Sequence, residues 1–214
     1  MGTGILFDLD GTLLDTLEDL CDGVNYALTF HGYPTRTLEE VRRFVGNGAR
    51  ELIRLATPQD EDWEQVFATF KPYYDAHCQI KTRPYPGIAD ALAVLKSKYP
   101  IAIVSNKPDS AVKSLCADYF PDIYALGEAP SCPRKPAPDM VFKAMAAIGV
   151  EHCIYVGDSE VDVLTAKNAG VPCLCVTWGF REKTAMEAVG GQHFCGQTED
   201  LIAQLEDRLR RVES

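Results

Sequence analysis

The stretch Gly4-Ile5-Leu6-Phe7-Asp8-Leu9-Asp10-Gly11-Thr12 places two carboxylates at the end of a short apolar run. The apolar residues predict a buried strand, and side chains two positions apart on a strand point to the same face. Asp8 and Asp10 would therefore lie together at one edge of a sheet. Because unpaired charges beside an apolar layer are costly, this placement indicates either a functional site or a turn with solvated acids. The rest of the chain decides between these two interpretations.

The segment that follows carries helical patterns and no convincing strand. Asp15 and Thr16 can cap a first helix that runs to about residue 31, and further helices are predicted at about 37–44, 48–57 and 60–79. An ordinary loop between a strand and a helix has about 2–6 residues, so this block is far too long for a connection. We expect an inserted all-helical cap domain over residues 15–82, placed above the edge that holds Asp8 and Asp10.

The remaining chain alternates between helices and short apolar strands. Residues 82–87 read as a stiff linker. Strands are predicted at 101–104, 123–126, 153–156 and 172–176, and helices at about 88–98, 109–118, 138–148, 160–169 and 198–211. Continuous apolar strands that alternate with helices are typical of a parallel sheet covered on both faces. The predicted fold is α/β, with a Rossmann-like core made of residues 1–14 and 83–214 and the helical cap inserted into it.

Polar residues gather where the predicted strands end, and ligands of such sheets bind beyond the carboxyl ends of the strands. Each of these residues alone would be a weak signal, because it could equally belong to a turn, be a solvated cation or cap a helix. Beside Asp8 and Asp10, the sheet topology brings together Ser105, Asn106, Lys107, Lys135, Asp158 and Asp162. Their order along the chain makes the functional interpretation the stronger one.

These residues form four motifs, and with them the chain resembles the haloacid dehalogenase superfamily. The motifs are Asp8-Leu9-Asp10-Gly11-Thr12, Val104-Ser105-Asn106, Lys135-Pro136-Ala137-Pro138 and Gly157-Asp158-Ser159-Glu160-Val161-Asp162. The resemblance covers essentially the whole chain, because a helical cap after the first motif also fits. The segments 44–50 and 176–181 are similar to the phosphoglycolate-phosphatase-like branch, and this narrower match is less specific.

The residues themselves suggest a reaction. Asp8 is ionised at neutral pH and could attack phosphorus to give an aspartyl-phosphate. Asp10 is near enough to protonate the leaving oxygen and later to take a proton from water. Lys135, the Ser105 hydroxyl and the Asn106 backbone N–H would bind the phosphoryl oxygens. Asp8, Asp10 and Lys135 are thus the predicted catalytic residues.

Four acids at one edge repel one another, which favours a hard divalent cation such as Mg²⁺. The resemblance implies that its ligands are the Asp8 carboxylate, the Asp10 backbone carbonyl and the Asp158 carboxylate. Asp162 and Thr12 would support these ligands from a second layer, Asp162 through ordered water or Lys135.

The resemblance implies a Mg²⁺-dependent phosphatase acting on a small phosphorylated metabolite. Family members that dehalogenate lack the acid at the position of Asp10, and ion-pumping ATPases carry Thr there. Three alternatives remain open at this point: a sugar phosphomutase, an inorganic pyrophosphatase, and a phospho-aspartate signalling module akin to a receiver domain. The long cap and Asp10 argue against the signalling module.

Arg50 is the one cap residue that the sequence singles out. It opens a helix after Gly46-Asn47-Gly48, and a glycine-rich turn before a helix N-terminus is suited to anions. Arg50 would then bind the non-reacting anionic end of a substrate. Alternatively, it lies on the solvated face of its helix.

Composition excludes several classes of partner. The 214 residues carry a net charge of −10, which argues against nucleic acid and anionic membrane surfaces. No apolar run approaches the ~20 residues of a membrane helix, and the N-terminus shows no signal peptide. We expect a cytoplasmic protein, either a monomer or a dimer.

Overall fold

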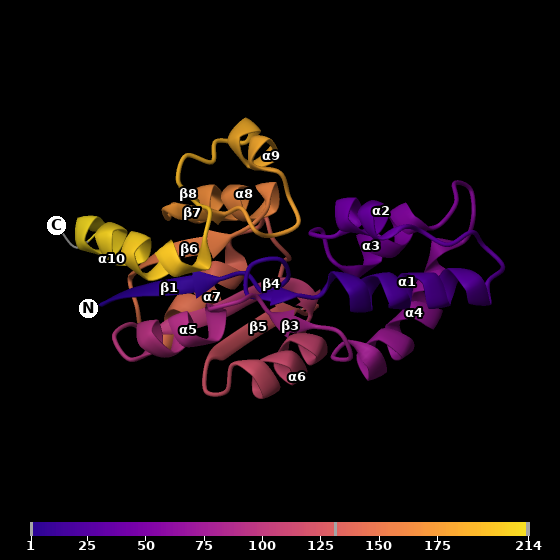
Figure 1. The fold of residues 1–214 in the computed structure, drawn as a ribbon, viewed down its shortest axis with the longest axis horizontal. Coiled ribbons are helices and arrows are strands. Elements are labelled where there is room, and N and C mark those ends of the chain that lie inside the picture. Colours follow the sequence, from indigo (N-terminus) through magenta and orange to yellow (C-terminus); the bar gives the residue numbers. More distant parts are fainter. Residues whose placement is uncertain (1, 131, 213–214) are drawn as a thin grey trace.

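The computed structural model describes residues 2–130 and 132–212. Parallel strands form one six-stranded sheet in the order β5-β4-β1-β6-β7-β8, with β1 near its centre (Figure 1). The strands are β1 (Thr3–Phe7), β4 (Ile101–Pro108), β5 (Tyr124–Glu128), β6 (His152–Gly157), β7 (Cys173–Val176) and β8 (Phe194–Cys195). The predicted parallel sheet is therefore confirmed, and its central strand leads directly into Asp8.

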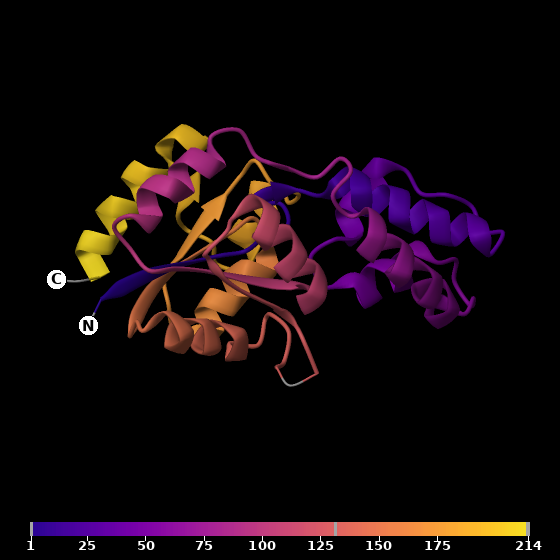
Figure 2. The same cartoon turned by 90° about the horizontal axis from the view of Figure 1, so that it is seen from below.

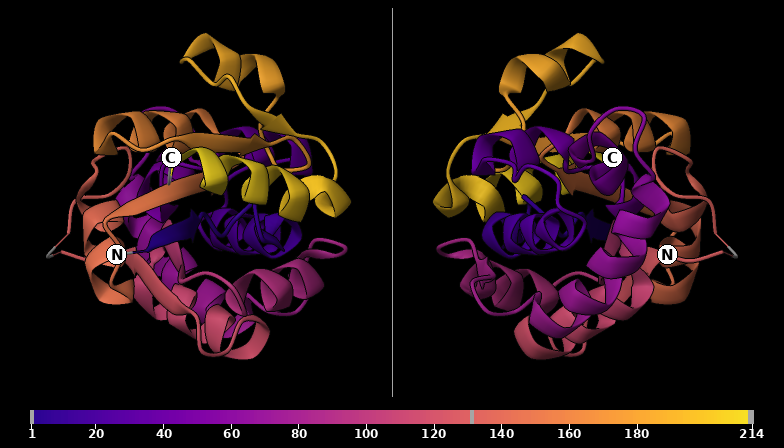
Figure 3. Two further views of the ribbon diagram at one scale, coloured as in Figure 1. Left: turned by 90° about the vertical axis from the view of Figure 1, so that its left-hand side faces the viewer. Right: turned by 90° about the vertical axis from the view of Figure 1, so that its right-hand side faces the viewer.

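Helices cover both faces of this sheet. On one face lie α5 (Ile88–Lys96), α6 (Asp109–Tyr119) and α10 (Leu201–Val212), and on the other lie α7 (Asp139–Ile148) and α8 (Glu160–Ala169). The alternation along β1 shows how the sequence achieves this, because Ile5 and Phe7 pack into the first layer while Leu6 packs into the second. Figures 2 and 3 show the layering from two further directions. The predicted α/β fold class is confirmed.

The inserted block is helical and has a hydrophobic core of its own. It consists of α1 (Leu17–Phe30), α2 (Leu38–Phe44), α3 (Ala49–Ala56) and α4 (Trp63–His77). Val24, Leu28, Ile53 and Phe70 are fully or almost fully buried in its interior. Phe180, from the loop after β7, joins this cluster from the sheet side. The block lies beyond the carboxyl end of the sheet, as predicted for a cap (Figure 1).

A short antiparallel pair joins the two parts. β2 (Leu14–Asp15) pairs with β3 (Arg83–Pro84), so the chain enters and leaves the cap side by side. The Asp19 carboxylate, in the first turn of α1, accepts hydrogen bonds from the backbone amides of Lys81 and Thr82. The sequence predicted a linker at 82–87 and no strand, because two-residue strands leave no periodic pattern. The domain boundaries at 15–82 stay a prediction.

The C-terminal part holds two further elements that the sequence did not predict. Strand β8 pairs with β7 and extends the sheet, and the short helix α9 (Lys183–Ala188) lies between these two strands in the chain. A 3-10 turn, Thr198–Asp200, precedes α10. Met186 of α9 packs on Cys175 and Val163, which anchors this edge. Within the described ranges, none of the helices is long and apolar enough to span a membrane.

Candidate active site

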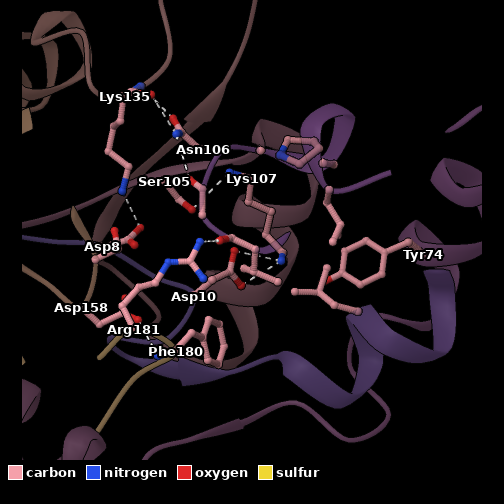
Figure 4. A pocket seen from close by; sticks show the side chains of 18 residues that line it. Asp8, Asp10, Tyr74, Ser105, Asn106, Lys107, Lys135, Asp158, Phe180 and Arg181 are labelled. Atoms are coloured by element: carbon pink, nitrogen blue, oxygen red, sulfur yellow. Dashed lines mark hydrogen bonds and ion pairs between the residues drawn. The ribbon is translucent and has the colours of Figure 1, made fainter. Parts of the chain in front are cut away.

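Asp8 lies at the floor of a cavity between the sheet edge and the cap. Its backbone amide donates to Val156 of the neighbouring strand β6, which holds it in line with the sheet. Its carboxylate Oδ1 lies 2.8 Å from Nζ of Lys135 (Figure 4). Asp8 is only 7% exposed and Lys135 only 2%. The structure therefore brings the predicted nucleophile and the predicted cation into direct contact.

Lys135 is held in place by a buried network on the far side from Asp8. Its ammonium contacts Asp162 Oδ1 at 2.8 Å and the Tyr155 hydroxyl at 3.1 Å. The other Asp162 oxygen accepts hydrogen bonds from the Ser159 amide and hydroxyl, at 3.1 and 2.6 Å. Both Asp162 oxygens are thus occupied by protein donors, which suits a supporting role behind Lys135.

Asp158 reaches the cavity from the end of β6. Its Oδ1 accepts a hydrogen bond from the Thr12 hydroxyl at 3.1 Å, and its Oδ2 accepts one from the Phe180 amide at 2.7 Å. The loop that carries Phe180 can approach this closely because residue 179 is glycine. A Cβ there would lie 2.3 Å from Asp158 Oδ2. Thr12 therefore lies behind Asp158, where the sequence predicted a supporting residue.

The buried charges do not balance at this point of the site. Carboxylate oxygens of Asp8, Asp158 and Asp162 lie within 4.8 Å of one another, and Lys135 is the cation in contact with two of them. Burial and the Asp162 charge raise the pKa of Asp8 well above its usual value and that of Asp158 to about 7. Ionising all three acids beside one base would leave an excess of two negative charges, and a divalent cation would neutralise them.

The same cluster indicates which acids would hold such a cation. Each Asp162 oxygen accepts two hydrogen bonds, from Lys135 and Tyr155 or from Ser159, and has no lone pair left. Each Asp158 oxygen accepts only one, and Asp8 keeps one oxygen outside its ion pair, so these two carboxylates have lone pairs for a cation. Carboxylates of this kind suit Mg²⁺, which prefers hard oxygen ligands. The donor set therefore fits the predicted ion.

Asp10 belongs to a second ion pair, with Lys107. Lys107 Nζ lies 2.9 and 3.1 Å from the two Asp10 oxygens, and the Thr16 hydroxyl donates to Asp10 Oδ1 at 2.7 Å. Burial alone would lower the pKa of Lys107, but the Asp10 carboxylate, helped by Tyr74, outweighs it and holds that pKa above its usual value. The Asp10 charge is thus neutralised locally, apart from the Asp8 cluster. The sequence placed Lys107 at this edge and gave it no role.

Ser105 and Asn106 are buried and lie within β4, which continues to Pro108 instead of ending at residue 104 as predicted; its pairing with β5 shifts register between Val104 and Pro108. The Asn106 side chain does more than the sequence indicated. Its Oδ1 accepts from the Lys135 amide at 2.7 Å, and its Nδ2 donates to the Lys135 carbonyl at 3.0 Å and to Gly46 of the cap at 3.2 Å. Asn106 therefore positions the Lys135 loop and touches the cap at once.

Mainly apolar side chains of the cap line the cavity. One long side chain from the core, Arg181, binds the cap. Leu20, Val45, Ala49 and Leu52 line the cap side. Arg181, from the loop after β7, donates to the carbonyls of Arg42 and Val45 at the end of α2 and pairs with Glu160 at 3.2 Å. A cation at a helix C-terminus satisfies carbonyls that the helix leaves free.

The structure does not bring Arg50 to the cavity. Arg50 is exposed, and its guanidinium carbon lies 4.8 Å from the centre of the Phe67 ring on the neighbouring helix. Residues 49 and 52 line the cavity, and Arg50 does not. The solvated alternative of the sequence analysis matches this placement.

Several residues of the site left no recognisable signal in the sequence. Tyr155 reads as one more apolar strand position, although its hydroxyl contacts both Lys135 and Asp162. Tyr74 and Arg181 come from segments whose side-chain directions depend on how the cap packs on the core. The position of Lys107, directly after Ser105 and Asn106, was the one available hint.

A family model described as "Haloacid dehalogenase-like hydrolase" matches residues 5–176. A phosphoglycolate phosphatase from Rhodobacter capsulatus is 36% identical over 201 residues, covering 88% of this chain and 90% of that protein. Phosphoglycolate phosphatase 1 from Pseudomonas aeruginosa is 37% identical over 191 residues, covering 82% and 70%. These comparisons confirm the predicted resemblance and the predicted enzyme class, a phosphatase.

Solved structures agree with the fold. A structure from Lactobacillus delbrueckii subsp. bulgaricus has a TM-score of 0.87 and 36% identity and covers 95% of this chain and 98% of its own. A haloacid dehalogenase-like hydrolase from Streptococcus pneumoniae has a TM-score of 0.86 at 25% identity, with the same coverage. Because each match covers 95% of this chain, each includes both the sheet core and the helical cap.

Proposed function

The chain belongs to the haloacid dehalogenase-like hydrolase family, and we propose that it is a Mg²⁺-dependent phosphatase of small phosphomonoesters, using Asp8 as the nucleophile. The observation that carries this proposal is the Asp8 carboxylate at the floor of the cavity, in contact with Lys135 and beside Asp158. A 2-phosphoglycolate-like ester is the proposed substrate, because relatives at 36% and 37% identity bear that name.

Asp8 performs the first step. Its carboxylate oxygen attacks phosphorus, the bond between phosphorus and the leaving oxygen breaks, and an aspartyl-phosphate forms. Lys135 holds Asp8 by one oxygen at 2.8 Å, which fixes the direction of the carboxylate. The same ammonium is available to the phosphoryl oxygens on which negative charge accumulates.

Asp10 supplies and removes the protons. In the first step the protonated Asp10, released from the Lys107 ammonium that it binds in this structure, gives its proton to the leaving oxygen. In the second step it takes a proton from the water that attacks phosphorus and frees Asp8. The Ser105 hydroxyl and the Asn106 backbone amide, in the second half of β4, would bind the phosphoryl oxygens.

Asp8, Asp158 and the Asp10 backbone carbonyl would hold Mg²⁺, and Asp162 and Thr12 would support them through Lys135 and Asp158. When bound, the ion neutralises the excess negative charge and allows an anionic phosphate to approach it. The apolar cap side chains exclude water from the remaining space.

The test is a panel of phosphate compounds assayed for free phosphate with Mg²⁺. We expect release from 2-phosphoglycolate in preference to glucose 1-phosphate and inorganic pyrophosphate. Conversion of glucose 1-phosphate into an isomer without phosphate release would instead identify a mutase. Preferred cleavage of pyrophosphate would identify a pyrophosphatase.

A further inference from the structure

Tyr74 is a cap residue with a buried hydroxyl that the mechanism above does not use. It belongs to α4, is 3% exposed and lines the cavity. Its hydroxyl is buried and its oxygen interacts with the Lys107 ammonium outside strict hydrogen-bond geometry, so its proton has no acceptor among the described residues. In Figure 4 its ring points from the cap towards Lys107 and Asp10. Because a buried hydroxyl without a partner is costly, this arrangement indicates a polar group that belongs beside it.

Lys107 offers a second donor from the opposite wall of the same cavity. It is 5% exposed, and its Nζ lies 4.9 Å from the centre of the Tyr74 ring. An ammonium has three N–H donors, and the two Asp10 oxygens engage at most two of them. The third is directed at the Tyr74 oxygen, so it serves a ligand only if a ligand oxygen replaces or shares that contact.

The surroundings of these two donors define the group that they would bind. Leu20 and Leu52 line the adjoining cap wall, so an anion there would meet a hydroxyl and an ammonium in an otherwise apolar space. A carboxylate has two oxygens, one for each donor, and its charge is best satisfied by charge-assisted hydrogen bonds. Lys107 would stand between this carboxylate and Asp10, and so reduce the repulsion between them.

We propose that Tyr74 and Lys107 bind the carboxylate at the non-reacting end of the substrate and thereby select phosphorylated 2-hydroxy acids. This inference rests on the proposed phosphatase function and names the substrate class of that site. It assigns to these two residues the role that the sequence analysis offered to Arg50. One donor comes from the cap and the other from the core, so the carboxylate is fully bound only when the cap is closed. Such a ligand favours the closed state by its differential affinity.

The discriminating variant is Tyr74→Phe, which removes one oxygen atom and keeps the ring. Its matched control is Tyr73→Phe on the same helix, because Tyr73 stacks between Tyr26 and His77 on the outer side of the cap, away from the cavity. Each variant is assayed as kcat/KM on 2-phosphoglycolate and on ethyl phosphate, which has the same phosphate group and no carboxylate. Comparing variant with parent on each substrate removes the difference between the leaving groups.

We expect Tyr74→Phe to lower kcat/KM for 2-phosphoglycolate by about 10-fold or more, as for a hydrogen bond to a charged group. The loss on ethyl phosphate should be at least about fivefold smaller, and Tyr73→Phe should lower neither. Lys107→Met also releases Asp10, so it should weaken both reactions, and 2-phosphoglycolate more. Equal losses on the two substrates, or no loss with Tyr74→Phe, would overturn the carboxylate site.

Failure of the phosphatase function gives a different result. A parent protein that releases phosphate from no substrate would overturn that function, and the carboxylate site is then tested by binding. In that case 2-phosphoglycolate should raise Tm more than inorganic phosphate does, and Tyr74→Phe should remove the difference. Equal shifts from the two ligands in the parent would overturn the site as well.

Discussion

The sheet edge and the cap contribute to one cavity in different ways. At the edge, strands and their loops bring Lys135 into contact with Asp8 and place Asp158 beside it, and Ser105 lines the same cavity. The cap contributes mainly apolar side chains and the single hydroxyl of Tyr74. We therefore expect the edge to hold the reacting groups and the cap to determine which molecule reaches them.

This difference follows from how each region fixes its side chains. Hydrogen bonds between parallel strands set the register, so a residue at a strand end has a direction that the chain itself prescribes. A cap helix can be rotated about its axis by its packing alone, and each residue step turns a side chain by about 100°. Changes at the edge should therefore abolish the reaction, and changes in the cap should alter affinity or selectivity.

The largest effect should come from Asp8→Asn. It removes the nucleophile, and we expect kcat/KM to fall on the order of 10⁴-fold or more. The control is Asp118→Asn, an exposed carboxylate on α6, which should keep the parent rate. Steady-state release of phosphate from 2-phosphoglycolate measures both. Substantial residual activity in folded Asp8→Asn would remove the aspartyl-phosphate from the mechanism.

Metal exchange should act on the same region almost as strongly. Chelation should abolish activity and Mg²⁺ should restore it, because burial raises the pKa of Asp8 and Asp158 and a bound cation would keep both carboxylates ionised. Ca²⁺ should restore little, since its looser and larger coordination shell would let Asp8 bind through both oxygens and lose its attacking position. Equal rates with Ca²⁺ and Mg²⁺, at saturating concentrations of each, would contradict a tight octahedral site.

The same contrast explains what the sequence predicted. Apolar strands, helices between them and a long insertion after Asp10 were enough for the fold, and the strand positions were enough to place the proposed catalytic residues at one edge. The β2–β3 pair and β8 have two residues each, too few for any periodicity. The partners of Asn106 and Tyr155 depend on the distance between strands, which one sequence does not contain. Tyr74 and Arg181 required the docked position of the cap.

Closure of the cap should depend on Arg181. Its guanidinium is partly buried, binds two carbonyls at the end of α2 and pairs with Glu160. Arg181→Met should raise KM for 2-phosphoglycolate by about 10-fold, because charged hydrogen bonds contribute about 1.5–3 kcal/mol. The comparator is Arg134→Met, since Arg134 is exposed and makes one bond to the cap, to the Asn47 carbonyl at 2.9 Å. An equal rise in KM for both variants would mean that burial of the Arg181 contact is irrelevant.

The smallest effect should come from Arg50→Ala. Ala49 and Leu52 share the face of α3 that lines the cavity, and one residue step turns Arg50 off that face, onto the Phe67 ring. Loss of an exposed cation–π contact costs about 0.5–1 kcal/mol, so Tm should fall by a few degrees while kcat/KM changes less than about twofold. Phe67→Leu removes the other half of the contact and should lower Tm more, because Phe67 also packs on the cap core beside Phe70; adding Arg50→Ala to it should lower Tm no further. A selective loss on 2-phosphoglycolate with Arg50→Ala would instead place Arg50 at the carboxylate. That result would contradict the proposed carboxylate site at Tyr74 and Lys107, because one carboxylate cannot contact these two residues and Arg50 at the same time.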